Sequence, residues 1–482
     1  MERKSGVLLH VSSLWGDYSC GAFGKEGREF VDFLSDAGFS YWQVLPFCLP
    51  DGVSSPYKSY SAFSVNADLI DLKELRDAGL ITPLELEEAR QNTPYVCEFD
   101  RLKAERFELL KKAADRFKGD KTYDEFFKTH AHTEKFCHFM AIRAKNDDKV
   151  FQEWTSDEED AEVLQTWKFI CYTFVRQWKA LKKYANDKGV SIIGDIPIYV
   201  APDSSDVWES PDQFLVDYRG RPTRVAGVPP DYFSKDGQLW GNPLYNWKVM
   251  KADGFKWWRD RISFMCEFFD CIRIDHFRGL ESFYTCAPDA TNAINGKWMK
   301  GPGIKFVNVL KEVCGDKMLI AEDLGIITPA VKKLVDKSGL PGMRVLQFGF
   351  TDDAESPHLP HNYIKNCIAY TGTHDNDTLL GYVWNLDDAS RRRVLSYCGF
   401  SGDHWDCREA YLSVIRTMMC SVADTVIFPL QDILMYGSDT RMNTPGVPLG
   451  NWAWRVTKEQ LDGIDRSYFR YLNELFGRYK SK

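Results

Sequence analysis

The sequence predicts an α/β fold, and within that class a (β/α)8 TIM barrel with a helical insertion and long loops over the face where its strands end. Short runs rich in Val, Ile and Phe recur along the chain, several without polar alternation, which is typical of buried parallel strands. Most runs are followed or preceded by helical periodicity, and this alternation indicates right-handed βαβ crossovers. A length of 482 residues suits one barrel with insertions.

Eight runs are candidate strands, the number that a closed barrel requires. In chain order they are residues 7–14 (VLLHVSSL), 41–46 (YWQVLP), 192–200 (IIGDIPIYV), 269–275 (FDCIRID), 318–323 (MLIAED), 343–350 (MRVLQFGF), 367–373 (CIAYTGT) and 425–430 (TVIFPL). Amphipathic periodicity predicts helices between them, at residues 25–37, 256–268, 305–313, 329–337, 389–397 and 408–422.

Two long segments interrupt this alternation. Residues 72–186 are charged, periodic at helical spacing and nearly free of strand-like runs, so we expect a helical insertion after the second strand. Residues 201–245 are rich in Pro, Gly and Asp and are expected to form a long loop region over the barrel mouth. Residues 1–482 are therefore expected to form a single barrel domain that contains both segments.

Composition narrows the class of ligand and the compartment. A formal net charge of -8 and a pI near 5.7 argue against nucleic acid or an anionic membrane as a partner, since both select for clustered Lys and Arg. Aromatic residues make up 14% of the chain, and their flat faces suit stacking on sugar rings as well as core packing. The 13 cysteines form no CxxC pair, and neither an export signal nor a membrane span is recognisable, so a cytoplasmic protein is expected. The oligomeric state stays open.

Carboxylates stand at or near the ends of four predicted strands. Asp195 lies inside the third run and Asp275 closes the fourth, while Glu322 lies near the end of the fifth and Asp375 follows the seventh. Because barrel strands end on the face that carries active sites, these side chains are expected to meet there.

Such carboxylates suit chemistry at a glycosidic bond, where one group protonates the leaving oxygen and the other attacks the anomeric carbon or activates water. Arg273, two residues before Asp275, is expected on the same face and would keep Asp275 ionised. Glu322 must begin protonated, so its pKa is expected above the usual value of about 4.3, raised by Asp275 and Asp375.

The same residue types also occur in structural and metal-binding roles. An Asp at a strand end is a common helix N-cap, and a single His such as His276 or His374 is commonly a satisfied hydrogen-bonding residue. Carboxylates on successive barrel strands can also bind a divalent cation for enolisation chemistry. Spacing alone leaves these roles open beside the glycosidic one.

Long motifs favour chemistry at a glycosidic bond. FDCIRIDHFRG at residues 269–279, AEDLG at 321–325 and YTGTHDNDT at 370–378 resemble the catalytic signatures of the 4-α-glucanotransferase family, also called amylomaltase or disproportionating enzyme. Further stretches that resemble this family are residues 55–66, 194–208, 227–245, 341–348 and 441–446. The resemblance runs nearly from end to end and is to the compact type of the family.

The resemblance implies a role for each matching position. Asp275 matches the nucleophile, Glu322 the general acid/base, and Asp375 the third carboxylate, which binds and distorts the donor sugar. The implied substrate contacts are Arg273, His276 and His374 around the donor glucose, Tyr57 with Ser55 and Asp195 near the cleavage point, Asn443 in the donor site, and Asp231, Tyr232, Phe233 and Trp240 on a loop over the acceptor side. Loop packing is the alternative for these loop aromatics.

The implied activity is transfer of α-1,4-glucan segments to the 4-hydroxyl of glucose or another glucan, by a retaining double displacement through a covalent glycosyl-enzyme. The resemblance implies no cofactor and no metal. A retaining α-amylase-type hydrolase is one alternative, since it would use the same carboxylates but release reducing ends steadily. A non-catalytic glucan-binding protein is the other, although binding alone would not demand an acid at Glu322.

Overall fold

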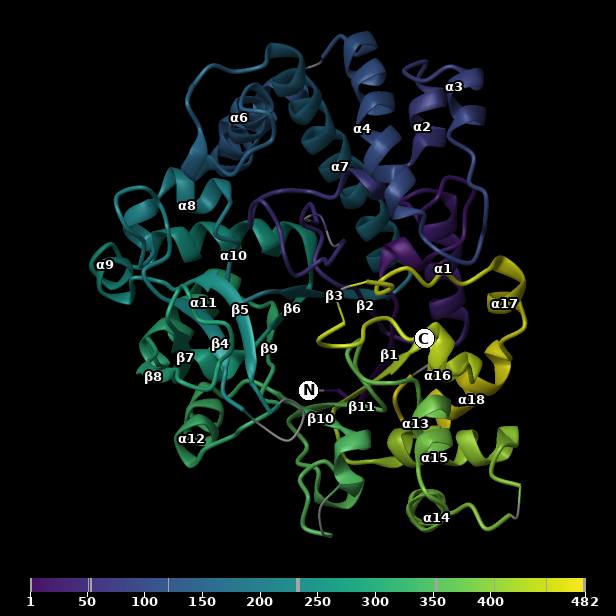
Figure 1. Ribbon diagram of the computed structural model, residues 1–482. Coiled ribbons are helices and arrows are strands. Elements are labelled where there is room, and N and C mark those ends of the chain that lie inside the picture. Colours follow the sequence, from purple (N-terminus) through teal and green to yellow (C-terminus); the bar gives the residue numbers. More distant parts are fainter. Residues whose placement is uncertain are drawn as a thin grey trace.

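The computed structural model describes residues 2–50, 52, 54–119, 121–230, 235–351, 354–402, 404–447 and 449–479. Its centre is a closed barrel of parallel strands in the order β1-β12-β11-β10-β9-β6-β3-β2, with helices around it (Figure 1). These strands are β1 Lys4–Leu8, β2 Tyr41–Gln43, β3 Ser191–Ile196, β6 Cys271–Ile274, β9 Met318–Ala321, β10 Gly342–Val345, β11 Cys367–Tyr370 and β12 Thr425–Pro429. The predicted (β/α)8 barrel is confirmed.

Each predicted apolar run extends past the carboxyl end of its strand. The run at residues 343–350 is an example, because β10 ends at Val345 and a 3-10 helix follows at Leu346–Phe350. Leu346 and Gln347 stay buried although they have left the sheet. The loops at this end of the barrel are covered by their neighbours, so their composition is strand-like and the sequence does not mark where the strand stops.

The six predicted helices are present with ends within two residues of the expected ones. They are α1 Lys25–Asp36, α10 Lys256–Phe268, α11 Ile304–Cys314, α12 Pro329–Ser338, α14 Asp388–Tyr397 and α15 Arg408–Cys420. In the described ranges outside residues 72–186, further helices are α8 Ser205–Glu209, α9 Trp247–Ala252, α13 Leu379–Asn385, α16 Leu430–Leu434, α17 Lys458–Asp462 and α18 Arg466–Leu475.

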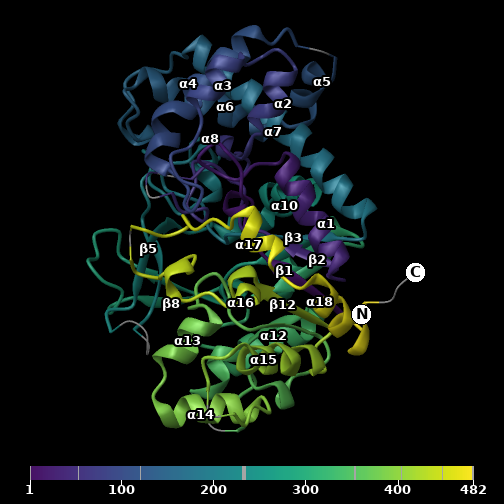
Figure 2. The ribbon, with the colours of Figure 1, turned by 90° about the vertical axis from the view of Figure 1, so that its right-hand side faces the viewer.

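Residues 72–186 contain helices that lie together beside the barrel, at the top of both views (Figures 1 and 2). They are α2 Leu72–Asp77, α3 Pro83–Glu88, α4 Phe99–Arg116, α5 Lys121–Thr129, α6 Ala131–Lys145 and α7 Ala161–Asp187. Helix α7 packs against α1 and α10, and its fully buried Trp178 donates from Nε1 to the carbonyl of Phe268 at 3.0 Å. The barrel and these helices therefore share one hydrophobic core. None of the helices in the described ranges has the length and apolarity that crossing a bilayer requires.

A second sheet flanks the barrel and was not predicted. It is antiparallel, in the order β5-β4-β7-β8, with β4 Val225–Val228, β5 Gln238–Pro243, β7 Ser282–Cys286 and β8 Lys297–Lys300. Two of its strands and helix α8 fall within residues 201–245, which corrects the expectation of an irregular loop there. The strands are short, β5 and β8 are mostly exposed or half-buried, and β4 pairs with β7 from more than fifty residues further along the chain. No long apolar run therefore marks this sheet in the sequence.

Candidate active site

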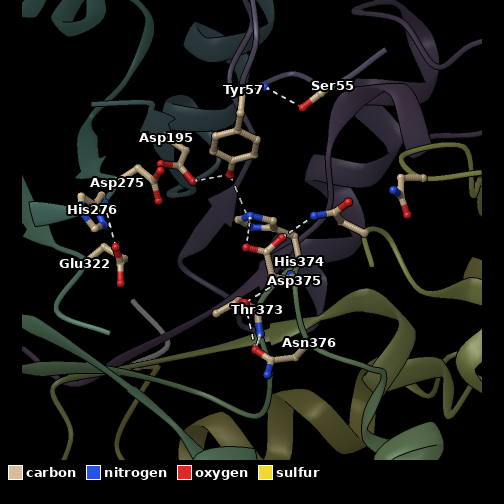
Figure 3. A network of polar contacts seen from close by, with 12 residues as sticks. Ser55, Tyr57, Asp195, Asp275, His276, Glu322, Thr373, His374, Asp375 and Asn376 are labelled. Carbon is tan, nitrogen blue, oxygen red and sulfur yellow. Dashed lines mark hydrogen bonds and ion pairs between the residues drawn. The ribbon is translucent and has the colours of Figure 1, made fainter. Parts of the chain in front are cut away.

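The polar residues at the strand ends converge at one end of the barrel (Figure 3). They are Asp195 on β3, Arg273 on β6, Asp275 directly after β6, Glu322 directly after β9, and His374 and Asp375 in the loop after β11. Local packing places Asp195, because a Cβ on the preceding Gly194 would lie 2.1 Å from the Phe269 ring. Only glycine lets β3 approach this ring and keep Asp195 aimed into the barrel.

A buried arginine organises the carboxylates. Arg273 Nη1 donates to both oxygens of Asp195 at 2.7 and 2.6 Å and to Asp275 Oδ1 at 3.0 Å. The side chains of Arg273 and Asp195 are 5% and 0% exposed, so this ion pair is shielded from solvent. Tyr57 Oη donates to the same carboxylate, at 2.7 Å from Asp195 Oδ2. Arg273 therefore holds Asp275 in a fixed position at the mouth of the barrel.

The pKa of Asp275 departs from the sequence-based expectation. Burial raises the pKa of this carboxyl group above its ordinary value, although the Arg273 guanidinium opposes the rise. Arg273 lowers this pKa as expected, but desolvation, which the expectation did not include, acts against it and has the larger effect. Of the two carboxyl groups Asp275 and Glu322, Asp275 is the one in direct hydrogen-bond contact with a cation, so it loses its proton first.

Glu322 has the environment of an acid. Burial raises its pKa to about 8, with the charge of Asp275 adding to the rise and Arg273 opposing it. Both of its oxygens accept backbone N–H groups, Oε2 from His276 and Oε1 from Leu324, each at 2.7 Å. The expected rise in pKa is found, but its first cause is burial rather than the neighbouring anions. Glu322 therefore carries its proton at neutral pH in a fixed orientation.

A bend at His276 links the two carboxyl groups. His276 has φ 50° and ψ 46°, a left-handed conformation that is uncommon outside glycine. This bend turns the chain directly after Asp275 so that the His276 N–H reaches Glu322 and the Phe277 N–H reaches the Glu322 carbonyl at 3.1 Å. Backbone strain of this kind is typical of sites where side-chain positions matter.

Asp375 and His374 form a second group of titratable side chains in the site. Desolvation alone would raise the pKa of Asp375, but the neighbouring His374 imidazole and a hydrogen bond from Asn443 outweigh it and hold the pKa well below the ordinary value. Asn443 Nδ2 donates to Asp375 Oδ1 at 2.6 Å, and His374 Nε2 lies 3.4 Å from Asp375 Oδ2. Burial lowers the pKa of His374, but the charge of Asp375 outweighs it and the net shift is upward. Asp375 is thus an ionised carboxylate.

Aromatic rings line the space between these groups. The Tyr57 ring stacks on His374 with centroids 5.1 Å apart and planes at 23°, and Ser55 Oγ accepts the Tyr57 backbone N–H at 3.3 Å. Trp240, on β5, meets the His276 ring edge to face at 4.9 Å. The structure thus brings together every described candidate residue, while Asp231, Tyr232 and Phe233 lie outside the described residues.

Three further residues belong to the site but were not identified from the sequence. Trp452 lies 5.8 Å from the rings of both Tyr57 and His374, at centroid distance. Arg441 donates to the backbone carbonyls of Asp375 and Asn443, at 2.6 and 2.7 Å. Met343 Sδ accepts from Arg273 Nε at 3.3 Å. Arg441 and Met343 stand inside motifs that resemble the family, whereas nothing in the spacing around Trp452 marks it.

This arrangement pairs a protonated carboxylic acid with an ionised carboxylate held by a guanidinium, the combination that cleavage of a glycosidic bond requires. A third carboxylate and stacked aromatic rings stand beside the pair, as a sugar-binding site requires. Among the described residues, no group of three or more His, Cys, Asp or Glu side chains is arranged to hold a metal ion.

Comparison with known proteins agrees with this chemistry. A family profile described as 4-alpha-glucanotransferase matches residues 9–461. The 4-alpha-glucanotransferase of Synechocystis is 39% identical over 99% of this chain and 98% of its own length, and that of Thermus thermophilus is 41% identical over 96% of both.

Solved structures of amylomaltases also resemble this chain. An amylomaltase from Streptococcus agalactiae, solved in complex with acarbose, superposes with a TM-score of 0.94 at 37% identity over 99% of this chain and 100% of that chain. An amylomaltase from Corynebacterium glutamicum shares the fold, with a TM-score of 0.82 at 18% identity over 99% of this chain and 75% of that chain. These relatives are glucanotransferases, which decides against the α-amylase-type hydrolase. The chain belongs to the 4-α-glucanotransferase family.

Proposed function

We propose that the protein performs 4-α-glucan transfer as a retaining double displacement, with Asp275 as nucleophile and Glu322 as general acid/base. The observation that carries the proposal is the contrast between the two carboxyl groups, since the pKa of Glu322 is raised to about 8 while Asp275 contacts Arg273 at 3.0 Å. A retaining enzyme needs one carboxyl group protonated and the other ionised at the start of its cycle.

In the first displacement, an oxygen of Asp275 attacks the anomeric carbon of an α-1,4-glucan donor. Asp275 Oδ1 is held by Arg273, whereas Oδ2 accepts no hydrogen bond from the described residues, so Oδ2 is the attacking atom. The proton of Glu322 passes to the glycosidic oxygen, and the glucan on that side leaves with a free 4-hydroxyl. Each oxygen of Glu322 accepts one backbone N–H, so a second lone pair remains on the oxygen that carries this proton.

In the second displacement, Glu322 acts as base. It removes the proton from the 4-hydroxyl of glucose or another glucan, and the alkoxide oxygen displaces Asp275 from the anomeric carbon. Two inversions give net retention of the α configuration. Charge builds up on the donor ring in both transition states, and the ionised Asp375 favours that positive charge electrostatically.

The acceptor side of the site decides between transfer and hydrolysis, because water competes for the same intermediate. Trp240 packs against His276, next to the proposed nucleophile, and offers an aromatic face on which an acceptor sugar stacks. Asp231, Tyr232 and Phe233 belong to the same segment and are proposed as further acceptor contacts. Tyr57, Ser55, Asp195, Arg273, His276, His374 and Asn443 are proposed as the donor-side contacts.

The cytoplasm is the proposed compartment. All 13 cysteines are free thiols, and a reducing compartment keeps them so. The potato relative, by contrast, is described as chloroplastic or amyloplastic.

Incubation of the purified protein with maltotriose, without metal or cofactor, tests the transfer reaction. We expect glucose and a ladder of longer maltooligosaccharides to form while the number of reducing ends stays constant. Steadily rising reducing ends with only shorter products would show hydrolysis, and unchanged maltotriose would contradict the proposed transfer.

A further inference from the structure

Among the described residues, the cysteine pairs Cys266 with Cys314 and Cys137 with Cys171 each have Sγ atoms 3.8 Å apart. A third pair, Cys20 and Cys97, also interacts through its thiols, and both of its members are buried. Of the first two pairs, one joins Cys266 on α10 to Cys314 at the end of α11, and the other joins Cys137 on α6 to Cys171 on α7. A disulfide requires a separation of about 2.05 Å, so each of these two pairs needs only a small local movement to close.

Access from solvent separates the two pairs. Cys137 and Cys171 are both 0% exposed, within the hydrophobic core. Cys266 is partly exposed, and Cys314 lies directly beneath it with 5% exposure. A dissolved oxidant therefore reaches Cys266 and reaches neither member of the buried pair.

The surroundings of Cys266 favour its thiolate. The hydrogen bond between Cys266 and Cys314 lowers the pKa of the Cys266 thiol, and the cations of Lys317 and Lys182 lower it further against the effect of burial. Both lysines are held in place, since Lys317 Nζ donates to the carbonyl of Phe269 at 2.7 Å and Lys182 Nζ lies 3.2 Å from Asp270. In contrast, burial raises the pKa of the Cys137 thiol well above its ordinary value. The thiolate is the reactive form of cysteine.

The backbone next to Cys314 can adjust to form a disulfide with Cys266. Cys314 is the last residue of α11, and the next residue, Gly315, has φ 58° with no atom within 4 Å of where a Cβ would stand. A helix end followed by a glycine adjusts more easily than a helix interior.

We infer that Cys266 and Cys314 form a peroxide-reactive dithiol, in which Cys266 is oxidised first and Cys314 closes the disulfide. The Cys266 thiolate attacks one oxygen of hydrogen peroxide, the O–O bond breaks, and the departing hydroxide takes up a proton to become water. Cys314 then attacks the Cys266 sulfenic acid, the S–O bond breaks, and the thiol proton leaves with the hydroxyl as a second water. Two thiols and one peroxide thus give one disulfide and two waters.

The position of the pair predicts its consequence. Cys266 lies in the helix before β6 and Cys314 in the helix before β9, so both lie at the amino ends of the strands that carry Asp275 and Glu322 at their carboxyl ends. The disulfide would cross-link residues 48 positions apart without reaching the substrate side. Oxidation is expected to raise the midpoint of thermal unfolding by a few degrees, reversibly with dithiothreitol, and to leave transfer activity within about twofold.

The test is to treat the full-length protein with hydrogen peroxide, alkylate it after denaturation without reductant, and map the peptides by mass spectrometry. We expect a linked peptide that contains Cys266 and Cys314, with Cys137 and Cys171 fully alkylated. In Cys314→Ser the sulfenic acid on Cys266 should persist and be trapped by dimedone, whereas Cys266→Ser should show neither the link nor a trapped Cys314.

The double variant Cys137→Ser/Cys171→Ser is the matched control and should form the 266–314 link at the wild-type rate. A link between Cys137 and Cys171 that forms first would overturn the inference, because it would mean that contact alone selects the pair. Full alkylation of Cys266 after peroxide treatment would overturn it as well.

Discussion

Asp275 and Glu322 are two carboxyl groups at neighbouring strand ends whose surroundings push them toward different roles. Glu322 is buried and Asp275 is half-buried, and desolvation raises the pKa of both. The difference is that the Arg273 guanidinium contacts Asp275 directly, while the hydrogen bonds that Glu322 receives from the described part of the chain come from backbone N–H groups. A cation placed on one member of the pair therefore assigns the proton to the other.

This assignment predicts an alkaline limit on transfer activity. Glu322 must be protonated to begin the cycle, so kcat/KM should fall as the pH rises above about 8, where Glu322 loses its proton. Initial rates on maltotriose across pH measure this limb.

Glu322→Gln should lower the rate by about 10²–10⁴-fold at neutral pH. The fluoride of α-maltosyl fluoride leaves without an acid, so Glu322→Gln should form the glycosyl-enzyme from this substrate at a rate that does not fall at alkaline pH. A fall in that rate at alkaline pH would show that a group other than Glu322 titrates. Glu312→Gln, a surface glutamate on α11, serves as control and should behave as the wild type.

Arg273 also stabilises the fold. It pairs with the fully buried Asp195 and with the half-buried Asp275, so Arg273→Met should cost about 3–5 kcal/mol in the free energy of unfolding, chiefly because Asp195 would be left buried and unpaired. Urea denaturation measures this. The double variant Arg273→Met/Asp195→Asn should recover part of the loss, since it removes one of the unpaired charges. Equal stability of the single variant and the wild type would mean that solvent reaches this ion pair.

The sequence identified most of this site because its carboxylates stand at strand ends, where the barrel topology brings distant residues together. Trp452 is different, because it comes from an irregular segment after the last barrel strand and meets Tyr57 and His374 only through the path of that loop. The sequence also could not predict that burial is the main cause of the raised pKa of Glu322, because desolvation depends on how tightly several loops pack around this side chain.

At the scale of elements, the second sheet carries Trp240 to the active site. Strand β5 pairs with β4, which pairs with β7 in turn, so Trp240 sits on a hydrogen-bonded strand beside His276 and not on an unsupported loop. The barrel strands and their helices could be predicted from apolar runs and periodicity. These flanking strands could not, because they are short, β4 and β7 pair across distant segments, and β5 and β8 are mostly exposed or half-buried.

This placement predicts how Trp240 contributes. Trp240→Ala should raise the KM for the acceptor by about tenfold, since a stacked aromatic face contributes roughly 0.5–1.5 kcal/mol beyond its buried area, and should change donor cleavage less. Release of fluoride from α-maltosyl fluoride, measured against glucose concentration, separates the two steps. Leu239→Ala, on the opposite face of the same strand, is the control for disturbance of the sheet. Equal losses in donor cleavage and acceptor use would argue against an acceptor role for Trp240.

At the scale of the whole molecule, the barrel and the helices of residues 72–186 share one core. Trp178 on α7 is fully buried, packs 4.6 Å from the ring of Phe47 and donates to the carbonyl of Phe268, just before β6. The helices therefore support the strand that leads to Asp275, and we expect them to fold together with the barrel.

A shared core predicts cooperative unfolding. Thermal transitions followed by far-UV circular dichroism and by tryptophan fluorescence should coincide, and Trp178→Ala should lower the stability of the whole protein by about 3–5 kcal/mol. Trp384→Ala, which removes a tryptophan that is 62% exposed, is the control and should shift the midpoint little. Two separate transitions in the wild type would indicate that the helical segment unfolds on its own.

The most direct test of the central claim is to trap the glycosyl-enzyme. Glu322→Gln incubated with α-maltosyl fluoride should accumulate a covalent intermediate, because fluoride leaves without an acid while the base needed for the second step is missing. Peptide mapping by mass spectrometry should then find one maltosyl unit on Asp275, and Asp275→Asn/Glu322→Gln should carry none. A maltosyl unit on any other residue, or β-maltose released without a covalent intermediate, would contradict the assignment of Asp275 as the nucleophile.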